Sequence, residues 1–261
     1  MIKTPLSTVI GGAFWTPEAT IIGGRQSFSQ LIKKLFANNE QGFFYDPNDL
    51  STMYQDAAGT VPVTAVGQAV GLIRDKSGRN NHAYQETSSS RPILRKNAVT
   101  GANYLEFDGV DDNLTLDPIS LPIPFSHVMA LEDRKLYGTQ ALFSAGSSGY
   151  LMFTGDSGLG VQQNAGNPAM YTLRSKKEVI THIANNAGVT LKSNLSAATR
   201  SDIVHTNPYT AVSKKYIGAF NATQFSSAAR IDCYGSVFIN ETINSAAEEA
   251  IRAHFNNRIG V

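Results

Sequence analysis

Two carboxylates at alternate positions of one expected strand come nearest to a catalytic arrangement. Glu106 and Asp108 lie two residues apart in an alternating apolar and polar run, so both face the same side of that strand. Cleavage of a glycosidic bond needs two carboxyl groups, one as proton donor and one as nucleophile or base. Val110 takes the next place on this face, and Asp111 and Asp112 lie beyond it in a turn. We therefore predict structural roles for Glu106 and Asp108, and no enzymatic activity.

The same turn offers oxygen ligands for a metal ion. Asp108, Asp111 and Asp112 could supply part of the shell of roughly six to eight oxygen atoms that calcium prefers. Aspartates in turns more often accept hydrogen bonds from backbone N–H groups. No second acidic cluster in the sequence completes the shell. We predict a hydrogen-bonded turn, and calcium is the one cofactor left open.

Aromatic and amide side chains gather in loops expected in the second half of the chain. A sugar is recognised by an aromatic ring against its C–H face and by amide or carboxylate groups that bind its hydroxyls. The loops that offer both contain Tyr150, Asn164, Asn167, Tyr171 and Tyr209. Packing in the core or at its rim is the commoner role for any one of them. These five residues are the predicted ligand contacts.

Composition excludes several classes of protein. The chain has 261 residues with a net charge of +1 and no basic stripe, which argues against a nucleic-acid partner. No apolar run is long enough to predict a membrane span. Cys233 is the single cysteine and is expected to be a buried, inert thiol. Charged residues make up 16%, and Gly, Ser, Thr and Asn supply the remaining polarity, which favours strands and turns.

Short strands separated by turn residues dominate the sequence from about residue 103 onward. The clearest strand is 230–240, where alternation predicts that Ile231, Cys233, Gly235, Val237 and Ile239 share one face. This pattern is typical of a sandwich or barrel. A closing helix is predicted from the capping box Ser245–Glu248 to Gly260.

The first 40 residues differ from the rest. A helix capped by Ser27 or Ser29 is expected there, and its apolar stripe could pack on the chain's own sandwich or on a partner, with neither alternative favoured. We predict an arm with a helix over 1–40 that serves docking, and a sandwich over 41–261. The predicted assembly residues are Trp15, Phe28, Leu31, Ile32, Leu35 and Phe36.

Three passages resemble a known family of folds. They are Asp75–Ala83 (DKSGRNNHA), Leu105–Asp112 (LEFDGVDD), and the strand Ile231–Ile239 followed by NSAAE. In this order they resemble concanavalin A-like, laminin-G-like jelly-roll domains over roughly residues 41–261. The resemblance implies an all-β, antiparallel jelly-roll β-sandwich with an N-terminal arm and helix and a short C-terminal helix.

A further stretch resembles a module of tailed-bacteriophage and prophage structural proteins. It comprises Gly42–Asp56, Pro62–Thr64 and Gly67–Gln68. The resemblance implies a virion component of the tail, fibre or head decoration, on the particle surface. Its partners would be other virion proteins and further copies in a symmetric oligomer, and its outward-facing sandwich can bind host surface glycans. A glycosidase that cleaves polysaccharides on the same fold, and a stand-alone lectin-like adhesin, are the alternatives.

Overall fold

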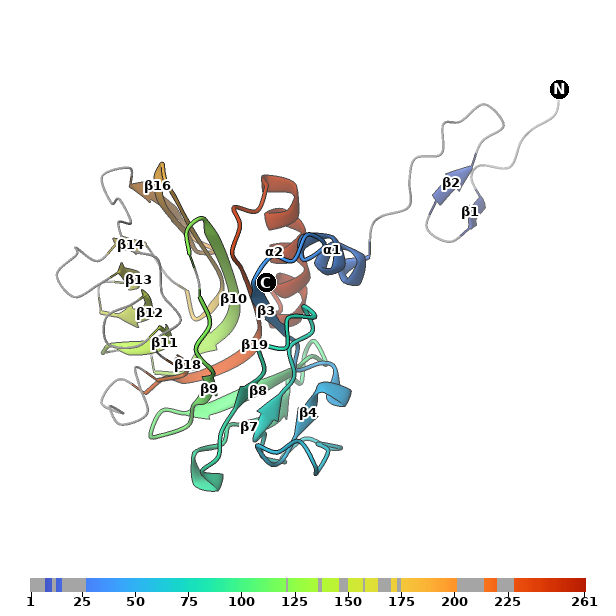
Figure 1. The fold of residues 1–261 in the computed structure, drawn as a ribbon, viewed down its shortest axis with the longest axis vertical. Helices are drawn as coiled ribbons and strands as arrows, with labels where there is room; N and C mark the ends of the chain where they lie inside the picture. Colours follow the sequence, from blue (N-terminus) through green and yellow to red (C-terminus); the bar gives the residue numbers. More distant parts are fainter. Residues whose placement is uncertain are drawn as a thin grey trace.

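Two antiparallel β-sheets and a layer of two helices make up the fold of this chain in the computed structural model (Figure 1). The structure describes residues 8–10, 13–15, 27–120, 122–135, 138–145, 150–156, 158–163, 170–172, 175–200, 214–219 and 228–261. Short runs of alternating apolar and polar residues form the strands, and glycines and aspartates form many of the turns. The prediction of an all-β sandwich is confirmed at this level.

The first sheet contains eight described strands in the order β17-β16-β15-β10-β19-β8-β7, with β3 also paired to β19. All of its pairings are antiparallel. Its strands are β3 (Gly42–Tyr45), β7 (Ile93–Lys96), β8 (Asn103–Asp108), β10 (Phe125–Asp133), β15 (Lys177–Asn185), β16 (Gly188–Lys192), β17 (Ala197–Arg200) and β19 (Arg230–Ile239).

The second sheet contains nine described strands in the order β14-β13-β12-β11-β18-β9-β6-β5-β4. They are β4 (Met53–Tyr54), β5 (Leu72–Ile73), β6 (Ala83–Tyr84), β9 (Leu114–Leu116), β11 (Gln140–Ser144), β12 (Tyr150–Gly155), β13 (Gly158–Gln163), β14 (Met170–Thr172) and β18 (Lys215–Ile217). A separate hairpin pairs β1 (Thr8–Ile10) with β2 (Ala13–Trp15), and two 3-10 turns span Leu50–Thr52 and Ser88–Ser90.

Two hydrophobic cores hold these layers together. The first lies between the sheets and takes side chains from both, such as Phe107 and Phe125 from the first sheet and Phe143 and Met152 from the second. The second lies between the first sheet and the helices α1 (Phe28–Leu35) and α2 (Ser245–Ile259). The first sheet is therefore covered on both faces, and one face of the second sheet is left without a helical cover (Figure 1).

Each helix begins with a side-chain cap. In α1, Ser27 Oγ accepts from the backbone N–H of Gln30, whose side chain accepts from the backbone N–H of Ser27. In α2 the cap is Asn244, whose Oδ1 accepts from the N–H of Ala247 at 2.9 Å. The predicted capping box starting at Ser245 is therefore wrong by one residue. Among the described residues, no helix is long and apolar enough to cross a membrane.

Helix α1 packs on its own sandwich. Leu31, Ile32 and Phe36 are buried in the second core, and the Phe28 ring stacks on His254 of α2 with the centroids 3.5 Å apart. Of the two predicted alternatives, packing on the chain's own sandwich or on a partner, the structure shows the first. Leu35 is partly buried beside it. The role of the six predicted residues in assembly stays a prediction, as does the division of the chain at residue 40.

A β-bulge in β19 changes which side chains face which core. Ala130 of β10 pairs with Gly235 and Leu131 pairs with Cys233, so Tyr234 is an extra residue. Before the bulge, Ile231 and Cys233 enter the core between the sheets; after it, Val237 and Ile239 enter the core under the helices. The prediction that Ile231 to Ile239 place alternate side chains on one face is therefore wrong. An inserted residue reverses the facing of all side chains that follow it in the strand.

We predict that Gly235→Ala destabilises the fold by roughly 1–3 kcal/mol. A Cβ there would lie 2.7 Å from the Phe255 ring and 3.0 Å from the Tyr45 carbonyl oxygen, at φ +149°. Gly155→Ala in β12 is the matched control, because its Cβ would lie 3.8 Å from Thr139 Oγ1 and meet nothing closer within the described part of the chain. Urea denaturation of both variants tests this, and equal stabilities would contradict it.

His254 is predicted to make stability depend on pH. Burial and nearby Arg258 lower its pKa to about 4. The unfolded state, with a pKa near 6.5, then binds the proton more readily, so stability is lost as the pH falls from about 6.5 to 4. His254→Phe keeps a ring against Phe28 and should lose less stability over that window. Denaturant midpoints at pH 7 and 4.5 measure the difference, and parallel losses in both proteins would contradict the assignment.

Candidate functional site

A row of side chains crosses the outer face of the second sheet. Tyr54, Leu72, Tyr84, Thr115 and Tyr216 stand opposite one another on β4, β5, β6, β9 and β18. Their chain neighbours in these strands point into the core between the sheets: Met53, Ile73, Ala83, Leu114, Leu116 and Ile217. Because side chains alternate along a strand, the row faces away from that core. We call Tyr54, Tyr84 and Tyr216 the tyrosine row.

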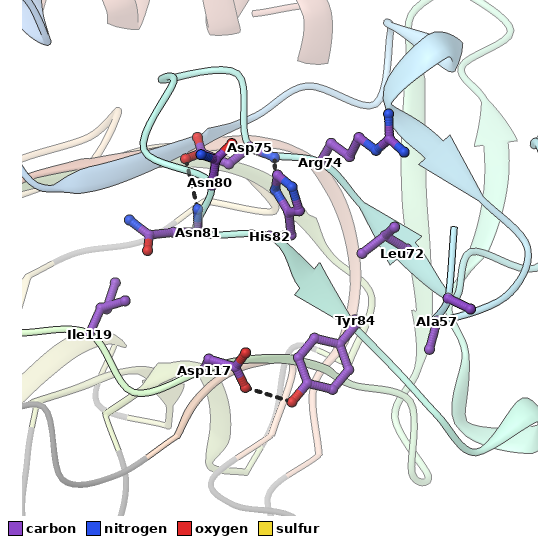
Figure 2. A pocket seen from close by; sticks show the side chains of 11 residues that line it. Ala57, Leu72, Arg74, Asp75, Asn80, Asn81, His82, Tyr84, Asp117 and Ile119 are labelled. Carbon is purple, nitrogen blue, oxygen red and sulfur yellow. Dashed lines mark hydrogen bonds between the residues drawn. The ribbon is translucent and has the colours of Figure 1, made fainter. Parts of the chain in front are cut away.

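Two pockets lie along this face and share Tyr84. The larger has a volume of about 580 Å³ and the smaller about 210 Å³. Figure 2 shows the larger pocket, with Asn81 and His82 on one side and Tyr84 and Asp117 on another. It is lined by Ala57, Ala58, Leu72, Arg74, Asp75, Asn80, Asn81, His82, Tyr84, Asp117 and Ile119. The smaller is lined by Tyr84, Gln85, Glu86, Thr87, Ser90, Asn113, Thr115, Lys214 and Tyr216.

Asp75 builds one wall of the larger pocket. Its carboxylate accepts from the backbone N–H groups of Phe44, Ser77 and Asn81 and from the Ser77 hydroxyl, at 2.7 to 3.1 Å. The backbone N–H of Asp75 donates to His82 Nδ1 at 3.1 Å. An acceptor nitrogen carries no proton, so the neutral ring has its N–H at Nε2. The loop is therefore rigidly folded, and His82 keeps one donor for a ligand.

Tyr84 joins the two pockets through its hydroxyl. It donates to Asp117 Oδ1 at 2.8 Å and accepts from the Lys214 ammonium at 3.0 Å. Lys214 also lies over the Tyr84 ring, 5.3 Å from its centroid. The hydrogen bond to Tyr84 raises the pKa of Lys214, which keeps it charged. A donor, an acceptor and an aromatic ring thus meet at one point.

Arg74 marks the far end of the larger pocket. Its guanidinium lies over the Tyr54 ring, 4.5 Å from the centroid, and the side chain is exposed. Amide groups of Asn80 and Asn81 line the same pocket. Aromatic rings flanked by amide, carboxylate and cationic groups suit a ligand that carries both C–H faces and many hydroxyls.

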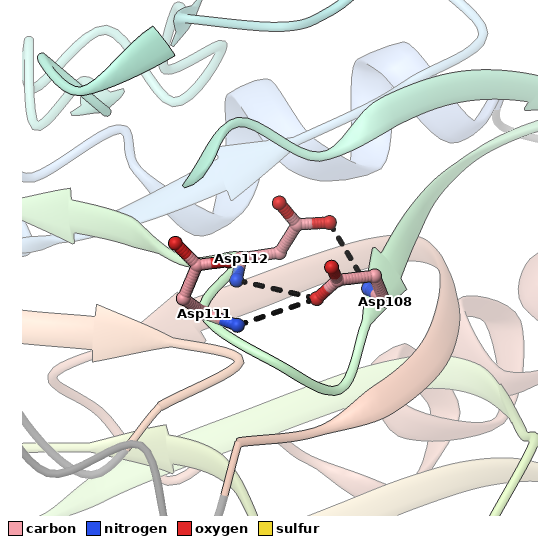
Figure 3. Close-up of side chains that lie close together, drawn as sticks. All are labelled: Asp108, Asp111 and Asp112. Carbon is pink, nitrogen blue, oxygen red and sulfur yellow. Dashed lines mark hydrogen bonds between the residues drawn. The ribbon is translucent and has the colours of Figure 1, made fainter. Parts of the chain in front are cut away.

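The predicted acidic turn forms as a hydrogen-bonded loop between β8 and β9. Asp108 Oδ1 accepts from the backbone N–H groups of Val110, Asp111 and Asp112. Figure 3 shows the bonds among the three aspartates, including the one that Asp112 Oδ2 accepts from Asp108 N–H. One carboxylate oxygen from each aspartate lies within 4.8 Å of the others. Burial, with Asp108 and Asp111 adding like charge, raises the pKa of Asp112 to about 7. The turn exists as predicted, and calcium binding stays a prediction.

A second group of carboxylates crosses the helix-side face of the first sheet. Glu132, Asp232 and Glu106 are directly opposite one another on β10, β19 and β8. Each has its own cation: Lys176 at 3.0 Å from Glu132, Arg134 Nε at 2.8 Å from Asp232, and Arg95 at 2.5 Å from Glu106. The Asp232 side chain is only 1% exposed, and its Oδ1 has no hydrogen-bond partner among the described residues. Burial raises its pKa to about 6.

The predicted ligand residues are not brought together by what the structure describes. Tyr150 begins β12 and Tyr171 lies in β14, at other positions of the second sheet. Asn164, Asn167 and Tyr209 lie outside the described residues. Their binding role stays a prediction.

The residues that line the two pockets form no pattern in the sequence that predicts a site. Tyr54, Tyr84 and Tyr216 come from three separate strands of two or three residues each. Two of the passages that resemble known proteins contain such residues: Gly42–Asp56 contains Tyr54, and DKSGRNNHA resembles a family of folds. Its Asn80, Asn81 and His82 prove to be pocket residues.

Comparison with known proteins finds fold relatives only. No family model matches the chain, and no curated protein matches it by sequence. An arabinofuranosidase solved with arabinofuranosyl-α-1,2-xylobiose is 11% identical with a TM-score of 0.59, over 87% of this chain and 65% of that one. A Trypanosoma rangeli sialidase solved with 2,3-difluoro-KDN is 16% identical with a TM-score of 0.53, over 95% and 36%. The chain thus spans less than two thirds of the length of either enzyme.

These neighbours overturn the prediction that the chain is not an enzyme. That prediction rested on Val110, which takes the place after Glu106 and Asp108 on one face of the strand and leaves Asp111 and Asp112 in a turn. The fold that the chain shares is found in two glycosidases, so the absence of a pattern on one strand excludes nothing. Identities of 11 and 16% show the fold alone, so the function has to be argued from the residues of this chain.

Asp112→Asn is predicted to stabilise the protein at pH 8. The folded pKa near 7 lies above the unfolded value, so the folded state holds the proton more tightly and stability falls as the pH rises from about 4 to 7. The amide removes the charge and can still accept from Asp108 N–H. Melting temperatures at pH 5 and 8 test this, with exposed Glu249→Gln as control. An unchanged pH dependence would refute the assignment.

Excess calcium extends the same experiment. If the acidic turn binds calcium, the wild-type melting temperature at pH 8 rises on addition of calcium and that of Asp112→Asn rises less. An equal response in both proteins would remove this turn as a metal site.

Proposed function

We propose that this chain is a carbohydrate-binding β-sandwich whose ligand lies on the outer face of the second sheet. The observation that carries the proposal is Tyr84, where an aromatic ring, a carboxylate and an ammonium group meet between two pockets. Aromatic rings bind the C–H faces of sugars, and such polar groups fix the hydroxyls. Asn80, Asn81 and His82 add donors and acceptors on the opposite wall.

We further propose a jelly-roll sandwich of the concanavalin A-like, laminin-G-like kind, carried on the surface of a bacteriophage particle. The passages DKSGRNNHA and LEFDGVDD support the first part, and Gly42–Asp56 supports the second by resemblance to phage structural modules. The fold neighbours are carbohydrate-active proteins, which supports a glycan as ligand. Host surface glycans are then the ligand, and other virion proteins the partners.

Tyr84→Ala is predicted to weaken glycan binding about tenfold, since one ring contact is worth on the order of 1 kcal/mol. A glycan array identifies the ligand, and titration calorimetry then compares wild type and variant. Lys96→Ala is the control, because it changes an exposed side chain on β7 of the other sheet. A folded variant that binds as tightly as wild type would refute the site.

Cleavage of glycosidic bonds is a second candidate function, favoured by the row Glu132–Asp232–Glu106. Directly opposite residues on antiparallel strands have Cβ atoms on the order of 5 Å apart, so their side chains are long enough to reach the separation of about 5 Å between the carboxyl groups of retaining glycosidases. Asp232, whose pKa is about 6, would give its proton to the departing glycosidic oxygen as the C–O bond breaks. A partner carboxylate would attack the anomeric carbon as that bond breaks and form a glycosyl-enzyme ester. The deprotonated Asp232 would then take the proton of the water that cleaves this ester. Arg134 covers Asp232 and would have to move aside.

Glu106→Gln is predicted to lower hydrolysis of a bound polysaccharide at least about a hundredfold if this row is catalytic. Reducing-end release from glycans found on the array measures it. Glu106 is half exposed, so the variant should fold. If the variant releases reducing ends as fast as the wild type, or if the wild type releases none, the cleavage function is rejected. The proposed binding of glycans on the second sheet would still stand.

A further inference from the structure

The tyrosine row has a regular spacing across the second sheet. Tyr54, Tyr84 and Tyr216 occupy β4, β6 and β18, and Leu72 and Thr115 occupy the strands between them. Hydrogen-bonded strands lie about 4.8 Å apart, so successive tyrosines are about 9.6 Å apart and the row is about 19 Å long. This length exceeds a single sugar, and each interval is close to two units of an extended pyranose chain.

We propose that the groove formed by the two pockets along the tyrosine row binds an extended run of several sugar units. The run lies across the strands, with the partly exposed rings of Tyr54 and Tyr84 two units apart and Tyr216 lining the smaller pocket beyond them. The proposal rests on the proposed carbohydrate-binding function and adds the class of glycan. A linear chain with an extended backbone fits, and a terminal monosaccharide does not reach more than one tyrosine.

The pockets lie in line along the row. The smaller is lined by Tyr84, Thr115 and Tyr216, so it occupies the interval between the last two tyrosines. The larger is lined by Leu72, Tyr84 and Arg74, and the Arg74 guanidinium lies over Tyr54, so it extends toward the first. One pocket therefore lies beside each of the two gaps between successive tyrosines. A continuous chain would pass through both.

Leu72 and Thr115, which lie between the tyrosines, do not project above the surface along which the ligand would lie. Leu72 is 7% exposed, Thr115 is 8% exposed and Tyr216 is 9% exposed, so the rings of the row that a ligand can reach are those of Tyr54 and Tyr84, which are partly exposed. Arg74 and Lys214 lie over Tyr54 and Tyr84, and both are exposed, long and unbranched up to their charged groups. Such side chains can move off a ring and lie along a bound sugar, where they still donate hydrogen bonds to its hydroxyls.

The polar groups of the pockets stand to either side of the row. In the larger pocket, Asn81 and His82 come from the loop held by Asp75, and Asp117 comes from beyond β9. Figure 2 shows Asp117 and Asn81 on different sides of the hollow. Groups on two flanks suit a ribbon-like chain, whose hydroxyls project from both edges and whose C–H faces lie above and below.

Binding of oligosaccharides of increasing length tests the proposal. The probes are β-1,4-linked xylo-, cello- and chito-oligosaccharides of two to six units, with α-1,4-linked malto-oligosaccharides of the same lengths as coiled controls. We expect an extended series to gain at least about tenfold in affinity from the disaccharide to the hexasaccharide, since each further ring contact is worth several-fold. The malto series should show no such gain.

Two variants test whether the increase in affinity with oligosaccharide length depends on the tyrosine row. Tyr54→Ala removes an end tyrosine and should abolish most of the gain from four to six units, with the disaccharide affinity unchanged. Tyr84→Phe keeps the central ring and loses the hydroxyl bonds to Lys214 and Asp117, so it should retain the dependence on length. A thermal melt of each variant confirms that it folds.

The outcomes separate the two proposals. If none of these probes, and no glycan on an array, binds, the carbohydrate-binding function itself is overturned. If a glycan binds with the same affinity at every length, or if Tyr54→Ala keeps the full gain, the extended-chain proposal is overturned and the binding function stands.

Discussion

The extra residue at Tyr234 in β19 is the constraint on which the arrangement of layers depends. β19 pairs with β10 along one edge and with both β3 and β8 along the other. A strand with strict alternation would present one set of side chains to each face along its whole length. The bulge lets Cys233 enter the core between the sheets and Val237 enter the core beneath the helices. Gly235 then leaves room for Phe255, which brings α2 directly against the strand.

The sequence predicted the class of fold well, and the bulge shows why it could not predict the details. Alternation and turn residues were enough to indicate a sandwich, because burial of one face per strand is a local property. The closing helix and the strand at 230–240 were found for the same reason. The facing of Val237 was predicted wrongly because an inserted residue reverses every later side chain, and its presence depends on partners far away in the chain. The cap at Asn244 was missed because two adjacent polar residues compete for one role.

The candidate site was less accessible to sequence reasoning than the fold. Residues of the tyrosine row lie on strands of two or three residues, too short to show any period. Their alignment arises only when five strands pair in register. The same holds for Glu132, Asp232 and Glu106, which are adjacent across three strands and distant along the chain. Of these three carboxylates, a search along a single strand finds Glu106 and neither of the other two. Chemistry assembled across a sheet leaves no spacing signature in the sequence, whereas the acidic turn at Asp108 is local and was predicted.

Opposite sides of the sandwich carry the two helices and the tyrosine row. Helix α1, the first described helix of the chain, packs with α2 over the first sheet, and the tyrosine row lies on the far side of the second sheet. The described start of α1 at Ser27 therefore lies on the side opposite the tyrosine row. If the molecule were attached to a larger assembly through the start of α1, the first sheet would face that assembly. The tyrosine row on the second sheet would then face away from it.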